Sequence, residues 1–232
     1  MLVYGKNVVK EYLDNNEKIY KAFMQDNFND LDIINLLNKK NINIIRLSKF
    51  DMDKKIKGLH QGIILEVEDY KYDSIDDVLN LDSALVVMLD HIEDPHNFGA
   101  IIRTSEAAGV DLIIIPNDRS ASVNPTVIKT SVGTTEKVKI AKVVNLNNTI
   151  KLLKENGFWI FGTDMDGAFY KELNYTGKSC IICGNEGKGM SKLVRENCDF
   201  IASIPMKGEV NSLNASVATG IILFEASTQR GE

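Results

Sequence analysis

The stretch DPHNFGAIIRTSEAAG, which begins at Asp94, places polar side chains where a strand–helix unit needs only packing residues. Asn97 is well placed as the N-cap of the helix and Gly109 as its end. Small side chains at the neighbouring helical positions leave room for a ligand beside the Arg103 guanidinium. The alternative is an ordinary ion pair between Arg103 and Glu106 or Asp94, and this stretch alone does not decide between the two.

A second polar stretch, CGNEGKGMS, begins at Cys183. Its glycines let the backbone approach a ligand closely or adopt positive φ. It is not a Walker A loop, because no glycine stands five residues before the Gly187–Lys188 pair, and a GxGxxG fingerprint is missing from the first strand–helix turn. Glu186, flanked by glycines, is either a site residue or a solvated loop acid.

A third stretch, IPMKGEVNSLNASVATG, leads into the last predicted helix. Ser212, Asn214 and Ser216 stand there at alternate positions. Helix capping accounts for one of these side chains. It does not explain all of them, so this stretch is also a candidate site segment.

The length and composition are those of an ordinary globular protein. A chain of 232 residues that is 44% hydrophobic can bury a core, as one large domain or as a small domain joined to a medium one. No stretch approaches the ~18 apolar residues of a membrane span. The N-terminus has an amphipathic helix pattern rather than that of a signal sequence, so we expect a soluble, cytoplasmic protein without a membrane partner.

The cysteines and histidines do not form a ligand set. There are 3 cysteines, an odd and sparse number that argues against a disulfide framework. Cys180 and Cys183 lie in the apolar run CIICG, which is typical of a buried strand, and residues three apart on a strand point to opposite faces. We therefore interpret them as core cysteines and expect no metal site.

Charge is unevenly distributed along the chain. The net charge of −5 offers no whole-protein attraction for nucleic acid. Between Lys39 and Lys57, however, lysine and arginine far outnumber the two acids Asp51 and Asp53. This run is either a solvated surface or a phosphate-contacting face on an otherwise acidic protein.

Apolar periodicity divides the chain into two parts. Residues 1–67 are predicted to form a small α/β unit with one helix beginning at residue 6, further helices near 30–40 and 49–58, and strands near 18–24, 42–47 and 62–68. Residues 68–83 are charged and weakly periodic, which indicates a linker. From residue 84 to 232, short β-rich runs alternate with helical patterns, including one at 125–132, which predicts a largely parallel sheet covered on both faces. Ligands bind beyond the carboxyl ends of strands in such sheets, and the three polar stretches all follow predicted strands.

Taken together, the three stretches resemble the motifs of the SpoU/TrmH branch of the SPOUT RNA methyltransferases, in the same order. The resemblance covers nearly the whole chain. The segments YGKNVVKEYL and HQGIILEV are similar to the substrate-binding domain of the subgroup that methylates a guanosine ribose in 23S rRNA. Ala215 stands where valine is usual, and SVGTTEKV departs slightly from the family pattern, but neither change removes a polar site residue.

The resemblance implies a fold, a cofactor and partners. Residues 84–232 would form a parallel-sheet α/β domain with a deep trefoil knot that binds S-adenosylmethionine (AdoMet), and residues 1–67 a ribosomal-protein-like α/β domain that binds the substrate. The partners implied are ribosomal RNA and a second copy of the chain. The residues implied as cofactor contacts, largely through their backbone, are Thr163, Gly184, Asn185, Gly187, Ile204, Met206 and Leu213.

The resemblance also implies a reaction, in which a ribose 2′-hydroxyl attacks the methyl group of a sulfonium without need of a metal. The hydroxyl must be aligned with the methyl and lose its proton as the bond forms. The family's catalytic set corresponds to Asn97, Arg103, Glu186, Ser212 and Asn214. Arg103 is the family's proposed base, but a guanidinium is almost always protonated. Arg103 could instead clamp an RNA phosphate, and it joins Lys54, Lys55 and Lys57 as an expected RNA contact.

Competing functions stay open at this level. The same chemistry on tRNA ranks below rRNA, because the front segments resemble the ribosomal subgroup. A catalytically silent RNA-binding or ribosome-assembly factor is disfavoured by the intact polar set. A base methyltransferase is less favoured still, since no cysteine is placed as a nucleophile beside a flipped base.

Overall fold

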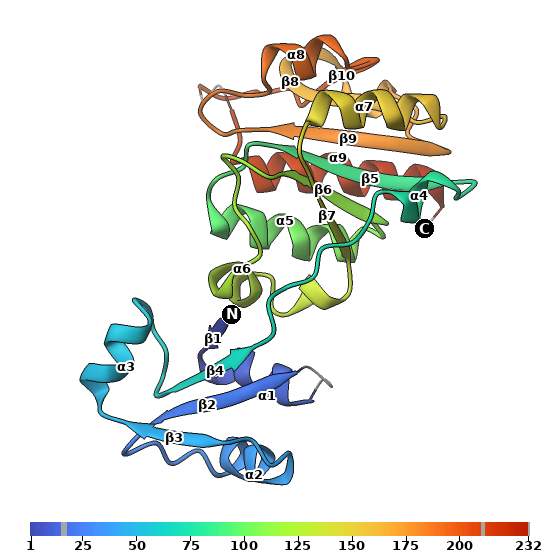
Figure 1. Cartoon of the computed structure of the whole chain (residues 1–232). Coiled ribbons are helices and arrows are strands. Elements are labelled where there is room, and N and C mark those ends of the chain that lie inside the picture. The colour runs from blue at the N-terminus through green and yellow to red at the C-terminus, as the bar shows by residue number, and fades with distance from the viewer. Residues whose placement is uncertain (15–17, 210–211, 232) are drawn as a thin grey trace. The chain divides into compact units, whose positions relative to one another are not determined.

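The computed structural model describes residues 1–14, 18–209 and 212–231. The chain forms two compact units (Figure 1). The first contains Met1–Lys71 together with Val123–Gly133, and the second contains Tyr72–Ser122 and Thr134–Glu232. The helix at 125–132, which the periodicity groups with the later strands, thus belongs to the first unit, where it contacts the first strand.

The first unit is a mixed four-stranded sheet in the order β1-β4-β2-β3. Only the β2–β3 pair is parallel among the sheet pairs described. The sequence pattern missed β1, since three residues are too few to show alternation. The elements are β1 (Leu2–Tyr4), α1 (Lys6–Asp14), β2 (Ile19–Gln25), α2 (Leu31–Lys39), β3 (Ile44–Leu47), α3 (Lys49–Lys55), β4 (Ile63–Val67) and α6 (Pro125–Thr130).

Local caps and one buried side chain hold α3 against this sheet. Ser48 is the N-cap of α3, and its Oγ accepts a hydrogen bond from the Asp51 N–H at 3.2 Å. Met52 is fully buried in a cluster with Phe23 and Ile64. The helix therefore buries one face and leaves the other in solvent.

The second unit confirms the predicted parallel sheet. All pairs of its six strands are parallel, in the order β10-β8-β9-β5-β6-β7. The strands are β5 (Ala84–Asp90), β6 (Leu112–Pro116), β7 (Lys139–Val143), β8 (Trp159–Phe169), β9 (Lys178–Gly184) and β10 (Phe200–Ser203). The helices are α4 (Asp76–Leu79), α5 (Pro95–Ala107), α7 (Leu146–Glu155), α8 (Lys192–Glu196) and α9 (Ala215–Arg230), with short 3₁₀ turns at Thr134–Glu136 and Tyr170–Glu172.

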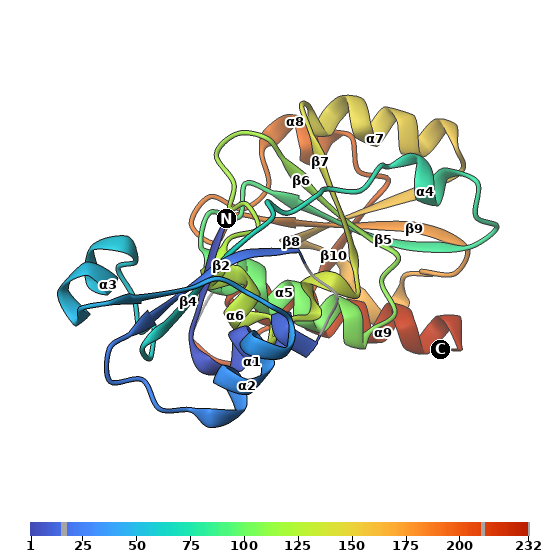
Figure 2. The ribbon, with the colours of Figure 1, turned by 60° about the horizontal axis from the view of Figure 1, so that its bottom comes forward.

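Helices cover both faces of this sheet, with α7 and α8 on one side and α5 and α9 on the other (Figures 1 and 2). Ile150 and Leu153 of α7 pack with Ile160 and Ile182 of the central strands in one buried cluster. Burial on both faces explains why the strands are continuous apolar runs. In the part of the chain that the structure describes, no helix is both long and apolar enough to cross a membrane.

Strand register brings the predicted loops to one edge of the sheet. β5 and β9 pair from Ala84 opposite Lys178 to Asp90 opposite Gly184, so both strands end together. The pairing of β10 with β8 shifts its partner from Gly162 to Ala168, so that residues 163–167 bulge out of the ladder. The bulge and the loops after β5, β9 and β10 therefore leave the same carboxyl edge.

Candidate functional site

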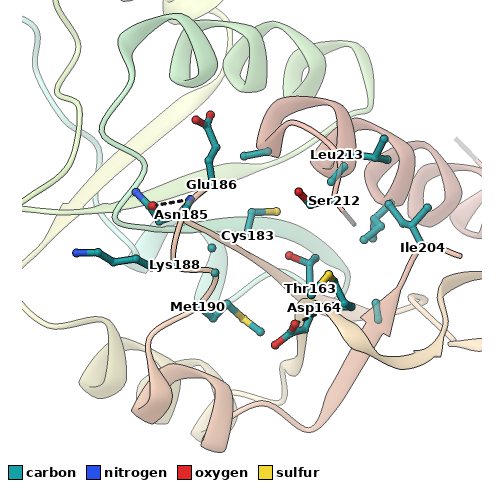
Figure 3. Close-up of a pocket in the computed structure, with 18 of the residues that line it drawn as sticks. Thr163, Asp164, Cys183, Asn185, Glu186, Lys188, Met190, Ile204, Ser212 and Leu213 are labelled. Atoms are coloured by element: carbon teal, nitrogen blue, oxygen red, sulfur yellow. Dashed lines mark hydrogen bonds between the residues drawn. The ribbon is translucent and has the colours of Figure 1, made fainter. Parts of the chain in front are cut away.

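A pocket of about 410 Å³ lies at this edge of the second unit (Figure 3). This volume suits a small-molecule ligand. The structure gathers into its lining all the residues expected as cofactor contacts, namely Thr163, Gly184, Asn185, Gly187, Ile204, Met206 and Leu213. Glu186 and Ser212 of the expected catalytic set also line it, whereas Asn97, Arg103 and Asn214 are not among the residues that line it.

The glycine-rich loop after β9 forms one wall of the pocket. A Cβ atom at Gly184 would lie 2.3 Å from the backbone of Gly189 and Met190, so only glycine allows this fold of the loop. The Asn185 and Gly189 backbones exchange hydrogen bonds of 3.0 and 2.8 Å, and Gly189 has a φ of +66°. The loop therefore presents backbone, with little side-chain bulk, to a ligand.

A buried carboxylate joins this loop to the end of β5. Asp90 is 1% exposed, and its Oδ2 accepts the Ser191 N–H at 2.6 Å. Its Oδ1 pairs with Nδ1 of His91, a residue held at a φ of +60°. The Asn185 Nδ2 donates to the His91 carbonyl at 2.8 Å. This network sets the position of the glycine loop relative to the first polar stretch.

Asp94, and not Asn97 as the sequence suggested, is the N-cap of α5. The Asp94 Oδ1 accepts the His96 N–H at 3.0 Å, and Pro95 takes the first helical position, where its missing N–H costs nothing. The His96 N–H holds the pKa of the Asp94 carboxyl below its usual value, helped by a 3.1 Å hydrogen bond from the Asn97 side chain. The Asn97 side chain therefore does not cap the helix and can contact another residue.

Asn97 and Asn214 join the first polar stretch to the third. Asn97 is 7% exposed, and its Oδ1 accepts a hydrogen bond of 2.9 Å from the Asn214 Nδ2. Asn214 is the N-cap of α9, where its Oδ1 accepts the Ser216 N–H at 2.9 Å and the Ser216 hydroxyl at 2.6 Å. The amide of Asn214 thus caps a helix with its oxygen and orients Asn97 with its nitrogen.

Arg103 is exposed on α5. Neither of the ion pairs considered for it, with Glu106 or Asp94, forms, and Arg103 has no hydrogen bond or ion pair with any residue in 1–14, 18–209 and 212–231. Its guanidinium is therefore available to an anionic ligand.

Several pocket residues were not expected from the sequence, among them Asp164, Cys183 and Lys188. The Asp164 Oδ1 accepts the Met165 N–H at 2.7 Å, and its Oδ2 accepts a 2.8 Å bond from Arg195. Asp164 thus fixes the bulge in β8. The only sequence signal for Asp164 as a pocket residue was its position directly after Thr163, an expected cofactor contact. Within the described ranges, no group of three or more His, Cys, Asp or Glu side chains could hold a metal ion.

The Cys183 thiol, which lines the pocket, is held in its protonated, unreactive form. Cys180 and Cys183 are buried in β9. Burial raises the pKa of Cys183 to about 11, despite hydrogen bonds from Thr219 and Thr163, and burial raises the pKa of the half-buried Cys198 to about 12. These thiols therefore stay protonated in the folded state. The contribution of each protonated thiol to stability is complete below pH 9 and is lost as the pH rises from about 9 toward 11 for Cys183 and toward 12 for Cys198.

We expect iodoacetamide to label the folded protein about 100-fold more slowly at pH 8 than the chain unfolded in urea, because only the thiolate reacts. Mass spectrometry of the labelled cysteines measures both rates, and free cysteine in the same urea solution controls for the solvent. Labelling of folded Cys183 at the unfolded rate would contradict the expectation.

The fold and the pocket together define a class of protein. It is a parallel-sheet α/β domain with helices on both faces and a small-molecule pocket at the carboxyl edge of the sheet. Matches to family models narrow this class to one protein family. Residues 84–224 match the SpoU rRNA Methylase family, and residues 2–73 match the RNA 2′-O ribose methyltransferase substrate-binding domain. The chain belongs to the SpoU methylase family, as its three motifs indicated.

Individual relatives agree with this assignment. The chain is 37% identical over 237 residues to a Bacillus subtilis protein named as the TrmH family tRNA/rRNA methyltransferase YacO, covering 98% of this chain and 95% of the relative. The structure resembles the SpoU methyltransferase AviRb from Streptomyces viridochromogenes in complex with AdoMet, with a TM-score of 0.84, 23% identity and coverage of 99% and 89%. It also resembles the A. aeolicus TrmH/SpoU tRNA modifying enzyme, with a TM-score of 0.60, 36% identity and coverage of 67% and 80%.

Proposed function

We propose that this protein transfers the methyl group of AdoMet to a ribose 2′-hydroxyl in ribosomal RNA, with a guanosine of 23S rRNA as the target. One observation carries the proposal. The three polar stretches of a SpoU family chain meet at one sheet edge, where Asn97 bonds to Asn214 beside a pocket formed by the other family positions.

The pocket suits AdoMet in size and chemistry. Apolar side chains of Ile204, Met206 and Leu213 offer a surface for the adenine, and glycine backbone leaves room for the rest. Glu186 supplies negative charge for a ligand that carries a sulfonium and an ammonium group, whereas the charge of Asp164 is already paired with Arg195. AdoMet bound here would supply an activated methyl group, and displacement by the ribose 2′-hydroxyl would release S-adenosylhomocysteine.

The protein's own residues align the hydroxyl and stabilise the charge that develops on it. We place Arg103 on an RNA phosphate next to the reacting ribose, where its unpaired cation also polarises the hydroxyl. A guanidinium rarely gives up its proton, so another acceptor, such as water or the RNA phosphate, takes the hydroxyl proton. Asn97, Asn214, Ser212 and Glu186 orient the ribose from the opposite loops.

The first unit supports an RNA substrate. Residues 2–73 match a substrate-binding model, and Lys54, Lys55 and Lys57 lie on or just after α3 in this unit. We assign these lysines to phosphate contacts. The A. aeolicus tRNA modifying enzyme covers 67% of this chain, which makes tRNA the alternative substrate.

A dimer, a knot and a cytoplasmic location complete the proposal. Val217 and Phe224 of α9 are each 50% exposed, and they line a hollow of about 500 Å³ together with Thr104 of α5. An apolar face of this kind supports pairing with a second copy of the chain. Family membership supports the trefoil knot, and an RNA substrate supports a cytoplasmic protein.

The decisive experiment combines labelled AdoMet with unmodified rRNA and tRNA and maps the product. We expect label in 23S rRNA at a guanosine 2′-oxygen and little in tRNA. Label in tRNA alone would favour the alternative substrate, and label on a base would contradict ribose methylation. Tight RNA binding without transfer to any RNA would favour the silent assembly factor.

Replacement of Asp90 by alanine is expected to weaken AdoMet binding roughly ten-fold, because it leaves the Ser191 N–H without its acceptor and frees the glycine loop. Calorimetric titration with AdoMet measures the affinity. Asp90→Asn keeps one acceptor oxygen for Ser191 and should retain most of it. Equal affinity in the alanine variant would show that the network does not hold the cofactor loop.

A further inference from the structure

An exposed aromatic ring on α3, in the first unit, lies beside an unpaired lysine. Phe50 is 66% exposed, although the neighbouring Met52 on the same helix is fully buried. The Lys54 Nζ lies 4.3 Å from the centre of the Phe50 ring. Helix α3 projects beyond one end of the four-stranded sheet (Figures 1 and 2).

The two carboxylates near this ring in sequence, Asp51 and Asp53, already accept hydrogen bonds from other residues. The Asp51 Oδ2 accepts the Ser48 hydroxyl at 2.6 Å. The His60 Nδ1 accepts the Gly62 N–H at 3.0 Å, so its proton is on Nε2, which donates to the Asp53 Oδ1 at 3.0 Å. Among the described residues, neither carboxylate forms an ion pair with a lysine of this helix.

The cations, in contrast, have no acidic partner. No carboxylate in residues 1–14, 18–209 and 212–231 forms an ion pair with the lysines on or just after α3, which are Lys49, Lys54, Lys55 and Lys57. Lys55 places its Nζ 4.1 Å from the centre of the Phe23 ring. An exposed ring with the unpaired Lys54 cation on it, and three more unpaired lysines within seven residues of it in sequence, complements a ligand that has both phosphates and a flat apolar group.

We propose that Phe50 and Lys54 form a stacking platform for an unpaired nucleobase of the substrate RNA, with the neighbouring lysines on the flanking phosphates. This inference rests on the proposed function and narrows its substrate class. Bases in a continuous duplex are already stacked on one another, whereas those in loops and bulges can turn onto an aromatic side chain. The platform therefore selects RNA with an accessible single-stranded segment.

The test measures binding of the full chain to a hairpin with an unpaired loop and to a blunt duplex of equal charge, at several salt concentrations. Phe50→Ala should weaken loop binding roughly ten-fold or more and duplex binding much less. Its salt dependence should match that of the unchanged protein, because no cation is removed. Lys54→Gln should instead lower the salt slope by roughly 0.7.

Two variants serve as controls. Phe50→Tyr keeps the ring and should keep loop binding. Leu31→Ala removes a side chain that is 69% exposed on α2 of the same unit, outside the lysine cluster, and should bind as the unchanged protein does. Thermal unfolding checks that each variant folds.

Equal loop binding by Phe50→Ala, or an equal loss on loop and duplex, would overturn the stacking platform. Neither result bears on the proposed function. That function is tested separately by measuring methyl transfer from AdoMet to RNA in the unchanged protein. Absence of that transfer would overturn the proposed function, while the binding measurements would still decide the role of Phe50.

Discussion

Replacement of Arg103 by alanine is expected to lower the rate of methyl transfer by about 10²- to 10³-fold while AdoMet binds with unchanged affinity. The guanidinium has no protein partner among the described residues, and it is not part of the pocket lining. Its removal should therefore cost little stability and leave the pocket intact. Single-turnover transfer to RNA measures the rate, and calorimetry measures the AdoMet affinity.

Arg103→Lys separates charge from geometry. Lysine keeps the positive charge but loses the planar fork that binds phosphate through two parallel hydrogen bonds. We expect an activity between those of the alanine variant and the unchanged protein. Full single-turnover activity in the alanine variant would remove Arg103 from the catalytic set, and a parallel loss of AdoMet affinity would make it a cofactor residue instead.

Replacement of Asn214 by aspartate is expected to lower kcat/KM by about 10- to 100-fold with less loss of stability than replacement by alanine. The aspartate still offers an oxygen to the N-terminal N–H groups of α9, so the cap is kept. However, an oxygen then replaces the Nδ2 that now donates to the Asn97 Oδ1 at 2.9 Å. Two acceptors face each other, and the connection between the first and third polar stretches is lost.

Asn214→Ala is the matched comparison, because it removes the cap as well as the connection. We expect it to lose similar activity and also about 1 kcal/mol of stability, measured by urea unfolding. If aspartate retained full kcat/KM, Asn214 would be a helix cap only. If both variants lost activity solely through unfolding, the Asn97–Asn214 bond would have no separate catalytic part.

The sequence predicted the second unit well because its signals are local. Apolar runs bounded by turns marked every strand of the parallel sheet, and helical periodicity marked α5, α7 and α9. The prediction of the first unit was less complete, because the three residues of β1 are too few to show an alternating pattern. At the start of α5, the sequence analysis favoured Asn97 as the cap, but Asp94 is the cap and Pro95 takes the first helical position, which suits proline.

The sequence by itself determined which loops carry the candidate site residues, because glycines and polar side chains follow the apolar strands in a readable order. The tertiary structure alone decided which of them meet. Asn97 and Asn214 are 117 residues apart, and their contact depends on strand order and register. Local patterns do not encode either, because register and neighbour choice follow from burial across the whole sheet.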